Sequence, residues 1–319
     1  MKLTRPFIFK KSGEQGFTLI ELLVVLATVA ILAALLLPAL AGTKPNSQAF
    51  QCMENQRQLT LGWQMYAADN TDLLPPNDYP YLTTYANAGV SQQAQLKNWV
   101  VGTMAKSVDA GDSPFLTGGI SELLDPNTLL SLYIKSREVY RCPADNYVDP
   151  YAGNRIHVRS YSMNSAVGTI FNSTTIMGGN DNRPVGSPVL GGWLPGNGYN
   201  GNQTTWLTYG KLTSFNRPGP ANTFVFMDEN PRSINDGSIA IPAKAIPGNT
   251  YRIDFTSGNH NNAATISFAD GHVNVHKWQD SRTYTVTASG QGNVVQSSSS
   301  LIPDDVDFFY LASITSALR

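Results

Sequence analysis

The strongest pattern in the sequence is an uninterrupted apolar stretch from Leu22 to Leu37, which follows a polar and basic N-terminal segment. With its apolar flanks the stretch covers Phe17–Ala41, which matches the roughly 20 apolar residues that a helix needs to cross a bilayer. Glu21 is the one charged residue inside it. A carboxylate in hydrocarbon costs about 2.5–3.5 kcal/mol near the centre of a helix, and less toward its end, so Glu21 requires a partner. The pattern predicts a membrane helix with a functional acid near its start.

A second helical stretch is predicted between Gln48 and Asn70. Apolar residues recur there at three- and four-residue steps, which is typical of a helix with one buried face. These residues are Phe50, Cys52, Met53, Leu59, Trp63 and Tyr66. Pro45 separates the two stretches, and we expect the helix to resume there because proline is tolerated in a first turn. Pro75-Pro76 and the polar residues before it predict the end of the helix near residue 70.

The remaining elements are predicted to be short. Alternation predicts a strand over Arg155–Ser162, and an apolar run predicts another over Thr223–Met227. Weaker signals predict a strand at 98–102, a helix from Asp125 to about Tyr133, and a helix or strand over Val306–Leu318. Residues 73–118 and 164–211 are rich in Gly, Asn and Pro, which predicts irregular structure, the second stretch forming an excursion from the core.

The clearest local signal is a β-hairpin near the C-terminal end. Residues 263–268 and 273–278 flank Asp270-Gly271, a dipeptide that favours a two-residue turn because glycine tolerates positive φ. This turn predicts that Phe268 faces Val273 on the apolar side of the hairpin.

Composition limits the classes of partner. Charged residues make up 14% of the chain, against about 25% in typical soluble domains. The net charge is −1. Residues 1–16 contribute a net of +3, which leaves about −4 for the rest of the chain. No basic stripe remains, so nucleic acid is not an expected partner.

The N-terminal segment has three interpretations. A secretory signal peptide would use Ala39-Leu40-Ala41 before Gly42 as its cleavage site. A permanent anchor would keep the basic residues at the cytoplasmic side of a single span. Neither interpretation explains the buried charge of Glu21.

The third interpretation rests on a family resemblance. The run Gly16-Phe17-Thr18-Leu19-Ile20-Glu21 resembles the class III signal of type IV prepilins and type II secretion pseudopilins. The resemblance implies that a prepilin peptidase cuts between Gly16 and Phe17 and methylates Phe17. It also implies that Glu21 pairs with the N-terminal ammonium of a neighbouring subunit, and that Pro38 lies where family members kink the helix.

A second resemblance lies near the other end of the chain. His260, nine further residues and Asp270-Gly271 resemble the H-X9-DG signature of large prepilin-like proteins called prepilin-type processing-associated. The runs Tyr140–Asp145 and Phe226–Glu229 also look like that group.

Together the two resemblances imply a fold, a location and a role. We expect a leader peptide over 1–16, a transmembrane and filament-core helix over 17–41, and one head over 42–319. The head would be an α+β pilin-like fold, with the helix continuing to about residue 70 on an antiparallel sheet. The protein would sit in the bacterial inner membrane with its head in the periplasm, and then in a filament.

The implied partners are other pilin or pseudopilin subunits, prepilin peptidase, the inner-membrane assembly machinery and membrane lipid. The implied role is that of a structural subunit, either of a type IV pilus or of a type II secretion pseudopilus.

The chain contains residues that can bind metals, but no complete ligand spacing. His260, Asp270, His272 and His276 form a loose group near the hairpin, without a zinc or calcium pattern. The oxygen donors for a calcium site would be Asp228, Glu229, Asn235, Asp236 and Asp270. We therefore expect no committed metal and no cofactor.

The two cysteines have two interpretations. In an exported head, a Cys52–Cys142 disulfide would join the long helix to the head across 90 residues. Buried free thiols are the alternative, because free cysteine is commonly buried.

An enzymatic function is not expected. The sequence contains no GxSxG elbow, no phosphate-binding loop and no CxxC motif. A different class of function is a cell-surface module that binds glycans and uses the pilin helix for export and anchoring. Its stacking surface would consist of loop aromatics, namely Trp99, Trp193, Tyr199, Trp206 and Tyr209.

Overall fold

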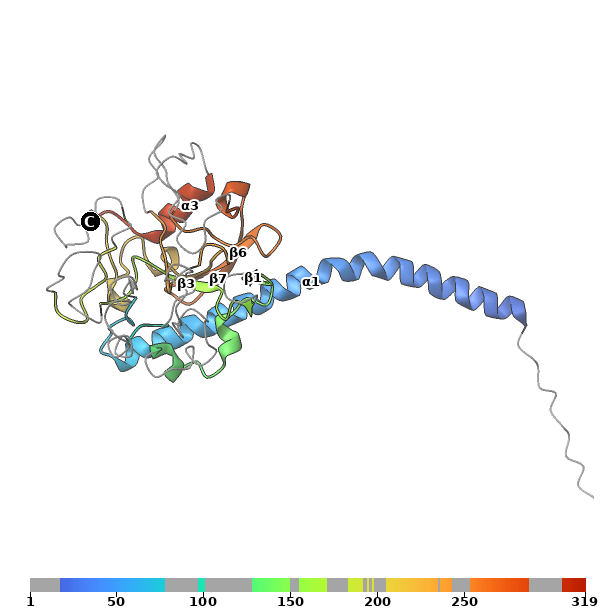
Figure 1. Ribbon diagram of the computed structural model, residues 1–319, viewed down its shortest axis with the longest axis horizontal. Helices are drawn as coiled ribbons and strands as arrows, with labels where there is room; N and C mark the ends of the chain where they lie inside the picture. The colour runs from blue at the N-terminus through green and yellow to red at the C-terminus, as the bar shows by residue number, and fades with distance from the viewer. Residues whose placement is uncertain are drawn as a thin grey trace, which may run out of the picture. The chain divides into compact units, whose positions relative to one another are not determined.

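A computed structural model places the protein in two compact units, Met1–Lys44 and Pro45–Arg319. It describes residues 18–77, 97–100, 128–149, 155–170, 183–191, 194, 197, 205–234, 236–242, 253–286 and 306–319, apart from the side chains of 35–46 and 155. The chain is mixed α/β, with a long N-terminal helix and a five-stranded sheet (Figure 1).

Helix α1 spans Leu19–Asp69, which is 51 residues. The predicted interruption at Pro45 is wrong, because the helix continues through both Pro38 and Pro45. A proline removes one backbone hydrogen bond, and the bonds of the neighbouring turns can carry a long helix past it. The kink at Pro38 stays a prediction.

The end of α1 is shaped by the polar residues that follow it. The Asp72 N–H donates to the Ala67 carbonyl at 2.9 Å, and the Asn70 side chain donates to the Tyr66 carbonyl at 2.8 Å. Thr71 and Asp72 have φ angles of 55° and 72°. These bonds satisfy carbonyl groups that have no partner at a helix end.

The main sheet has the order β5-β3-β4-β6-β7. Its strands are β3 (Tyr161–Asn164), β4 (Phe224–Asp228), β5 (Ser238–Ile239), β6 (Ala263–Phe268) and β7 (Val273–Lys277). All neighbours pair antiparallel except β3 and β5, which are parallel. A separate antiparallel pair consists of β1 (Val148–Asp149) and β2 (Arg155–Ile156).

The strand predicted over Arg155–Ser162 is divided between two sheets. Residues 155–156 form β2, and the next strand begins only at Tyr161. Arg159 lies in the interval with its side chain buried, where it donates to the Tyr161 carbonyl at 2.6 Å and to the Asp236 carbonyl. The chain turns there to bring this cation inside, and an alternation pattern does not report such a turn.

The predicted hairpin is present, but its register differs by one residue. Val273 pairs with Ser267, not with Phe268. Phe268 instead exchanges backbone hydrogen bonds with His272, so the loop contains three residues. Gly271 has a φ of 97°, which is the left-handed residue of the three-residue hairpin loop. Because side chains alternate, the shift places Val275 at the surface, 42% exposed.

The other elements are short. They are the 3-10 helices η4 (Leu129–Leu132), η5 (Arg137–Tyr140), η6 (Leu212–Ser214), η7 (Pro220–Asn222) and η8 (Ser281–Thr283), and the α-helix α3 (Val306–Thr315). Within the helix predicted over 125–133, the described part forms only η4. Asn98 forms an isolated bridge to Thr128, so the described part of the strand predicted at 98–102 is no ladder. The predicted linker at 291–300 lies outside the described residues.

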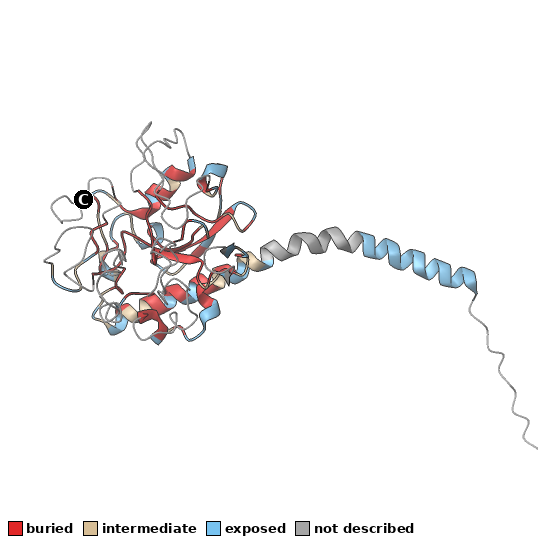
Figure 2. Cartoon of the chain, in the orientation of Figure 1, coloured by how far each residue is buried: buried red, intermediate tan, exposed pale blue. Residues whose placement is uncertain are grey.

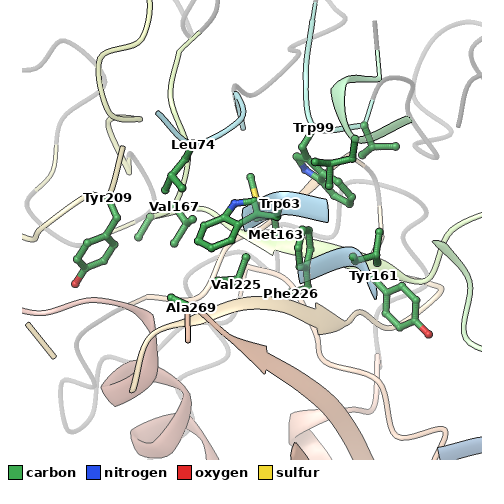
Figure 3. Packing of buried hydrophobic residues seen from close by; sticks show 14 of the residues in the cluster. Trp63, Leu74, Trp99, Tyr161, Met163, Val167, Tyr209, Val225, Phe226 and Ala269 are labelled. Atoms are coloured by element: carbon green, nitrogen blue, oxygen red, sulfur yellow. The ribbon is translucent and has the colours of Figure 1, made fainter. Parts of the chain in front are cut away.

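Buried side chains form two main clusters in the second unit (Figure 2). Leu59 and Trp63 of α1 belong to the same cluster as Val225 and Phe226 of β4 (Figure 3). Phe224 and Met227 of β4 belong to the other cluster, together with Leu311 and Ile314 of α3. The sheet thus contributes to two cores, one shared with α1 and one shared with α3.

Candidate functional site

Glu21 caps the start of α1. Its carboxylate accepts hydrogen bonds from the Thr18 N–H and the Thr18 hydroxyl, both at 2.8 Å. The Glu21 N–H donates back to the Thr18 hydroxyl at 3.3 Å. This is a reciprocal capping box, which satisfies donors that a helix start leaves open. Gly16 and Phe17, the predicted cleavage site, lie outside the described residues.

The first turns of α1 expose large apolar side chains. Those that are at least half exposed include Leu19, Ile20, Leu22, Leu23, Val24, Leu26, Val29, Ile31 and Leu32. The part of the chain whose side chains are placed has no helix that is long and apolar enough to cross a bilayer. The predicted span over 17–41 extends past that part.

Four side chains from distant parts of the chain meet inside the second unit. They are Cys52 of α1, Cys142 after η5, Asp228 at the end of β4 and His260 before β6. All four are buried, and their possible ligand atoms lie within 4.8 Å of one another. Cys52 and Cys142 form a disulfide. His260 Nε2 lies 3.2 Å from Cys142 Sγ and 3.4 Å from Asp228 Oδ2.

Local contacts bring the two cysteines to the same place. The Asn55 side chain, one turn after Cys52, donates to the Arg141 carbonyl at 2.9 Å and to the Glu138 carbonyl at 3.3 Å. These bonds hold the segment before Cys142 against α1.

Asp228 is oriented by the neighbouring strand. Its Oδ2 accepts hydrogen bonds from the Thr265 N–H at 2.9 Å and the Thr265 hydroxyl at 2.7 Å. The Tyr161 hydroxyl lies 3.1 Å from Cys52 Sγ. Burial and the nearby charge of Asp228 raise the pKa of Tyr161 well above its ordinary value, so Tyr161 is a neutral hydrogen-bond donor here.

The structure separates the residues of the H-X9-DG motif. His260 is in the buried group, whereas Asp270 is exposed in the hairpin loop, where it bonds the N–H and Nδ1 of His272. His276 stacks on Tyr310 at a ring distance of 3.8 Å. The loose metal group predicted from these histidines is therefore not assembled. The spacing of the motif carries no signal for the partners that His260 has, which are 32 to 208 residues distant.

A second buried group contains three carboxyl groups and one guanidinium. Glu229 accepts a hydrogen bond from Ser162, which in turn accepts one from Arg159 Nη1 at 2.9 Å. Burial, followed by the charge of Asp254, raises the pKa of Glu229 well above its ordinary value. Burial raises the pKa of Asp236 to about 6 and lowers that of Arg159 to about 10. Asp254 and Arg159 were not among the predicted site residues.

The oxygen donors predicted for calcium are dispersed. Asp228 joins the cysteines, Glu229 and Asp236 join Arg159, and Asp270 lies in the hairpin loop. Asn235 lies outside the described residues. Asp228 and Glu229 face different groups because successive side chains of a strand point to opposite faces.

The described loop aromatics are buried. Trp99 is fully buried and donates from Nε1 to the Gly237 carbonyl at 3.0 Å. Tyr209 and Trp206 are also buried. Trp193 and Tyr199 lie outside the described residues. The three described rings therefore do not provide the exposed stacking surface that glycan binding would need.

The comparisons with known proteins concern the N-terminal segment. Neither the curated proteins nor the solved structures contain a significant match to the chain. Residues 11–37 match the family model described as the prokaryotic N-terminal methylation motif. The match covers the predicted cleavage site and Glu21, and ends in the apolar stretch. The chain therefore carries a type IV prepilin-like signal.

Proposed function

We propose that the protein is a subunit of a type IV pilus or of a type II secretion pseudopilus-like filament. The match of residues 11–37 to the methylation motif is the observation that carries the proposal. Prepilin peptidase cuts between Gly16 and Phe17 and methylates Phe17. The apolar helix remains on the mature chain and anchors it in the inner membrane, with the head in the periplasm.

Glu21 directs the assembly of subunits. Its carboxylate is bonded only to Thr18, within the same turn of the helix. In a bilayer such a charge is costly, and a neighbouring ammonium stabilises it better than lipid does. The exposed apolar side chains of α1 supply the surface along which helices of neighbouring subunits bundle.

The head is a pilin-like fold in this proposal, and its role is structural. Two features support that arrangement. The Gln56 side chain donates to the Thr265 carbonyl of β6 at 2.9 Å, and Leu59 and Trp63 share a core with β4. The second half of the helix then packs on the sheet, as the N-terminal resemblance implies.

The test is the substitution Glu21→Ala in the native host. We expect cleavage after Gly16 and membrane insertion to be unchanged, and filament yield to fall at least tenfold, about 1.4 kcal/mol or more of lost subunit association. Glu54→Ala is the matched control, since Glu54 is a half-exposed acid of the same helix that pairs with Arg57. Filaments are quantified by shearing and electron microscopy.

Intact mass and N-terminal sequencing decide the processing step. A chain that begins at N-methylated Phe17 supports the proposal. A chain that begins at Gly42 supports the signal peptide, and an uncut chain supports the plain anchor. Normal filament yield from Glu21→Ala would refute the assembly role.

A further inference from the structure

We propose that the reduced form of the protein binds a thiophilic divalent cation, with Zn²⁺ as the best fit, through Cys52, Cys142, Asp228 and His260. The site is distinct from the filament helix and does not depend on the proposed assembly function. The disulfide form is the oxidised state of the same four-residue group.

The positions of the four side chains fit one tetrahedral ion. Zinc binds sulfur at about 2.3 Å and nitrogen or oxygen at about 2.0–2.2 Å, so its ligands lie about 3.3–3.8 Å apart. Cys142 Sγ and His260 Nε2 are 3.2 Å apart, His260 Nε2 and Asp228 Oδ2 are 3.4 Å apart, and Cys52 Sγ and Asp228 Oδ1 are 3.9 Å apart. Reduction frees the two sulfurs to separate, and the other spacings already match.

The donor set selects the kind of ion. Two thiolates and an imidazole favour zinc over calcium and magnesium, which prefer oxygen ligands. Four ligands from the protein also complete the closed shell that is typical of structural zinc sites.

The surroundings of the ligands match those of metal sites. Thr265 holds the Asp228 carboxylate with two hydrogen bonds, and the Tyr161 hydroxyl is placed to donate to the Cys52 sulfur. Such outer contacts orient ligands and adjust their basicity. All four ligands are buried, so water does not compete for the ion.

The charge of the reduced group also favours a cation. Asp228 is fully buried, and His260 is its one ion-pair partner among the described residues. An ion of charge +2 offsets the carboxylate and the thiolates, which are otherwise costly to bury. Metal binding and folding of the reduced head are then coupled.

The first experiment titrates the full chain, reduced with a phosphine in detergent micelles without oxygen, with Co²⁺. We expect visible ligand-field bands and a thiolate-to-cobalt charge-transfer band in the near ultraviolet, saturating at one ion per chain. Zn²⁺ should displace the cobalt and abolish both bands. The oxidised protein is expected to show neither band.

Variants assign the ligands. His260→Ala and Asp228→Asn should each weaken cobalt binding by about tenfold or more, as a lost ligand or oriented neighbour does. His272→Ala and Asp270→Asn remove the same side-chain types from the hairpin loop and should leave binding unchanged. Circular dichroism checks that each variant is folded.

X-ray absorption on the zinc-loaded wild-type protein avoids any variant that fails to fold. We expect a first shell of two sulfur and two nitrogen or oxygen ligands. A folded reduced protein that gives no cobalt bands would overturn the proposal, and so would a zinc shell without sulfur. Unchanged affinity in both His260→Ala and Asp228→Asn would overturn the assignment of four ligands.

Discussion

Asp236 shows how burial sets the behaviour of a single residue in this fold. Its carboxyl group lies beside Arg159, and Glu229 and Asp254 are the other acids of that group. One guanidinium cannot compensate three carboxylates, so burial dominates and the pKa of Asp236 rises to about 6. The folded chain therefore binds a proton at Asp236 more tightly than the unfolded chain does.

This difference predicts a pH dependence of stability. A carboxyl group with a raised pKa stabilises the fold fully below its unfolded value of about 4, and that contribution is lost as the pH rises through about 6. Asp236→Asn keeps the acceptor for the Ser238 N–H and cannot ionise. From pH 4 to 7 we expect its free energy of unfolding to gain about 1–3 kcal/mol relative to wild type.

Urea unfolding at a series of pH values measures this gain. Asp270→Asn removes an exposed carboxyl group and serves as the control. If Asp236→Asn and the wild type have the same pH dependence, the buried carboxyl group is not the cause.

Individual site residues were predictable from sequence where the signal is local. Gly16, Phe17 and Glu21 lie within one short motif, and residues 11–37 match its family model. The buried group was not predictable as a group, because Cys52, Cys142, Asp228 and His260 come from four separate elements. Only folding brings them together.

The contact between α1 and β6 is the clearest one between elements. Gln56 is fully buried and donates to the carbonyl and the hydroxyl of Thr265 at 2.9 and 2.8 Å. A neutral hydrogen bond contributes about 0.5–1.5 kcal/mol, and a buried acceptor left without its donor costs about 1–3 kcal/mol. The contact therefore stabilises the junction of helix and sheet.

Gln56→Ala should accordingly lower the free energy of unfolding by about 1–3 kcal/mol. Gln58→Ala, on the exposed side of the same helix, should change it by about 0.5 kcal/mol or less. Denaturant titration of both variants measures the two effects. Equal losses in the two variants would mean that helix propensity, and not the contact with β6, decides the outcome.

The elements themselves were predictable to different degrees. The Thr223–Met227 strand and the hairpin carry strong local patterns, and β4, β6 and β7 appear in these regions. The register of the hairpin was not predictable from the Asp270-Gly271 pair, because two- and three-residue loops both place glycine at positive φ. The strand at 155–162 failed for a tertiary reason, the burial of Arg159.

At the scale of the whole molecule, the disulfide joins residues that are 90 positions apart. In the chain-entropy account, closing a loop of this size stabilises the fold by about 4–5 kcal/mol before strain. The closed loop contains most of the first core, from Leu59 to Tyr140. The cross-link therefore acts on the helix and the head together.

Reduction in the presence of a chelator should lower the free energy of unfolding by several kcal/mol, up to about 4–5. The chelator matters because the proposed zinc site would otherwise offset part of the loss. Urea titrations with and without the phosphine measure the change. A Cys52→Ser/Cys142→Ser double variant should not respond to the phosphine; a response of similar size would place the effect elsewhere.

The continuity of α1 also has a mechanical consequence. The helix that would lie in the filament enters the head without a break at Pro45 and is bonded covalently to it at Cys52. When a filament is pulled, tension in the helix passes at Cys52 into the segment around Cys142, before it reaches Leu59 and Trp63. The packed residues beyond the cross-link are thereby shielded from load, and a head can be torn from its stem only by breaking a covalent bond.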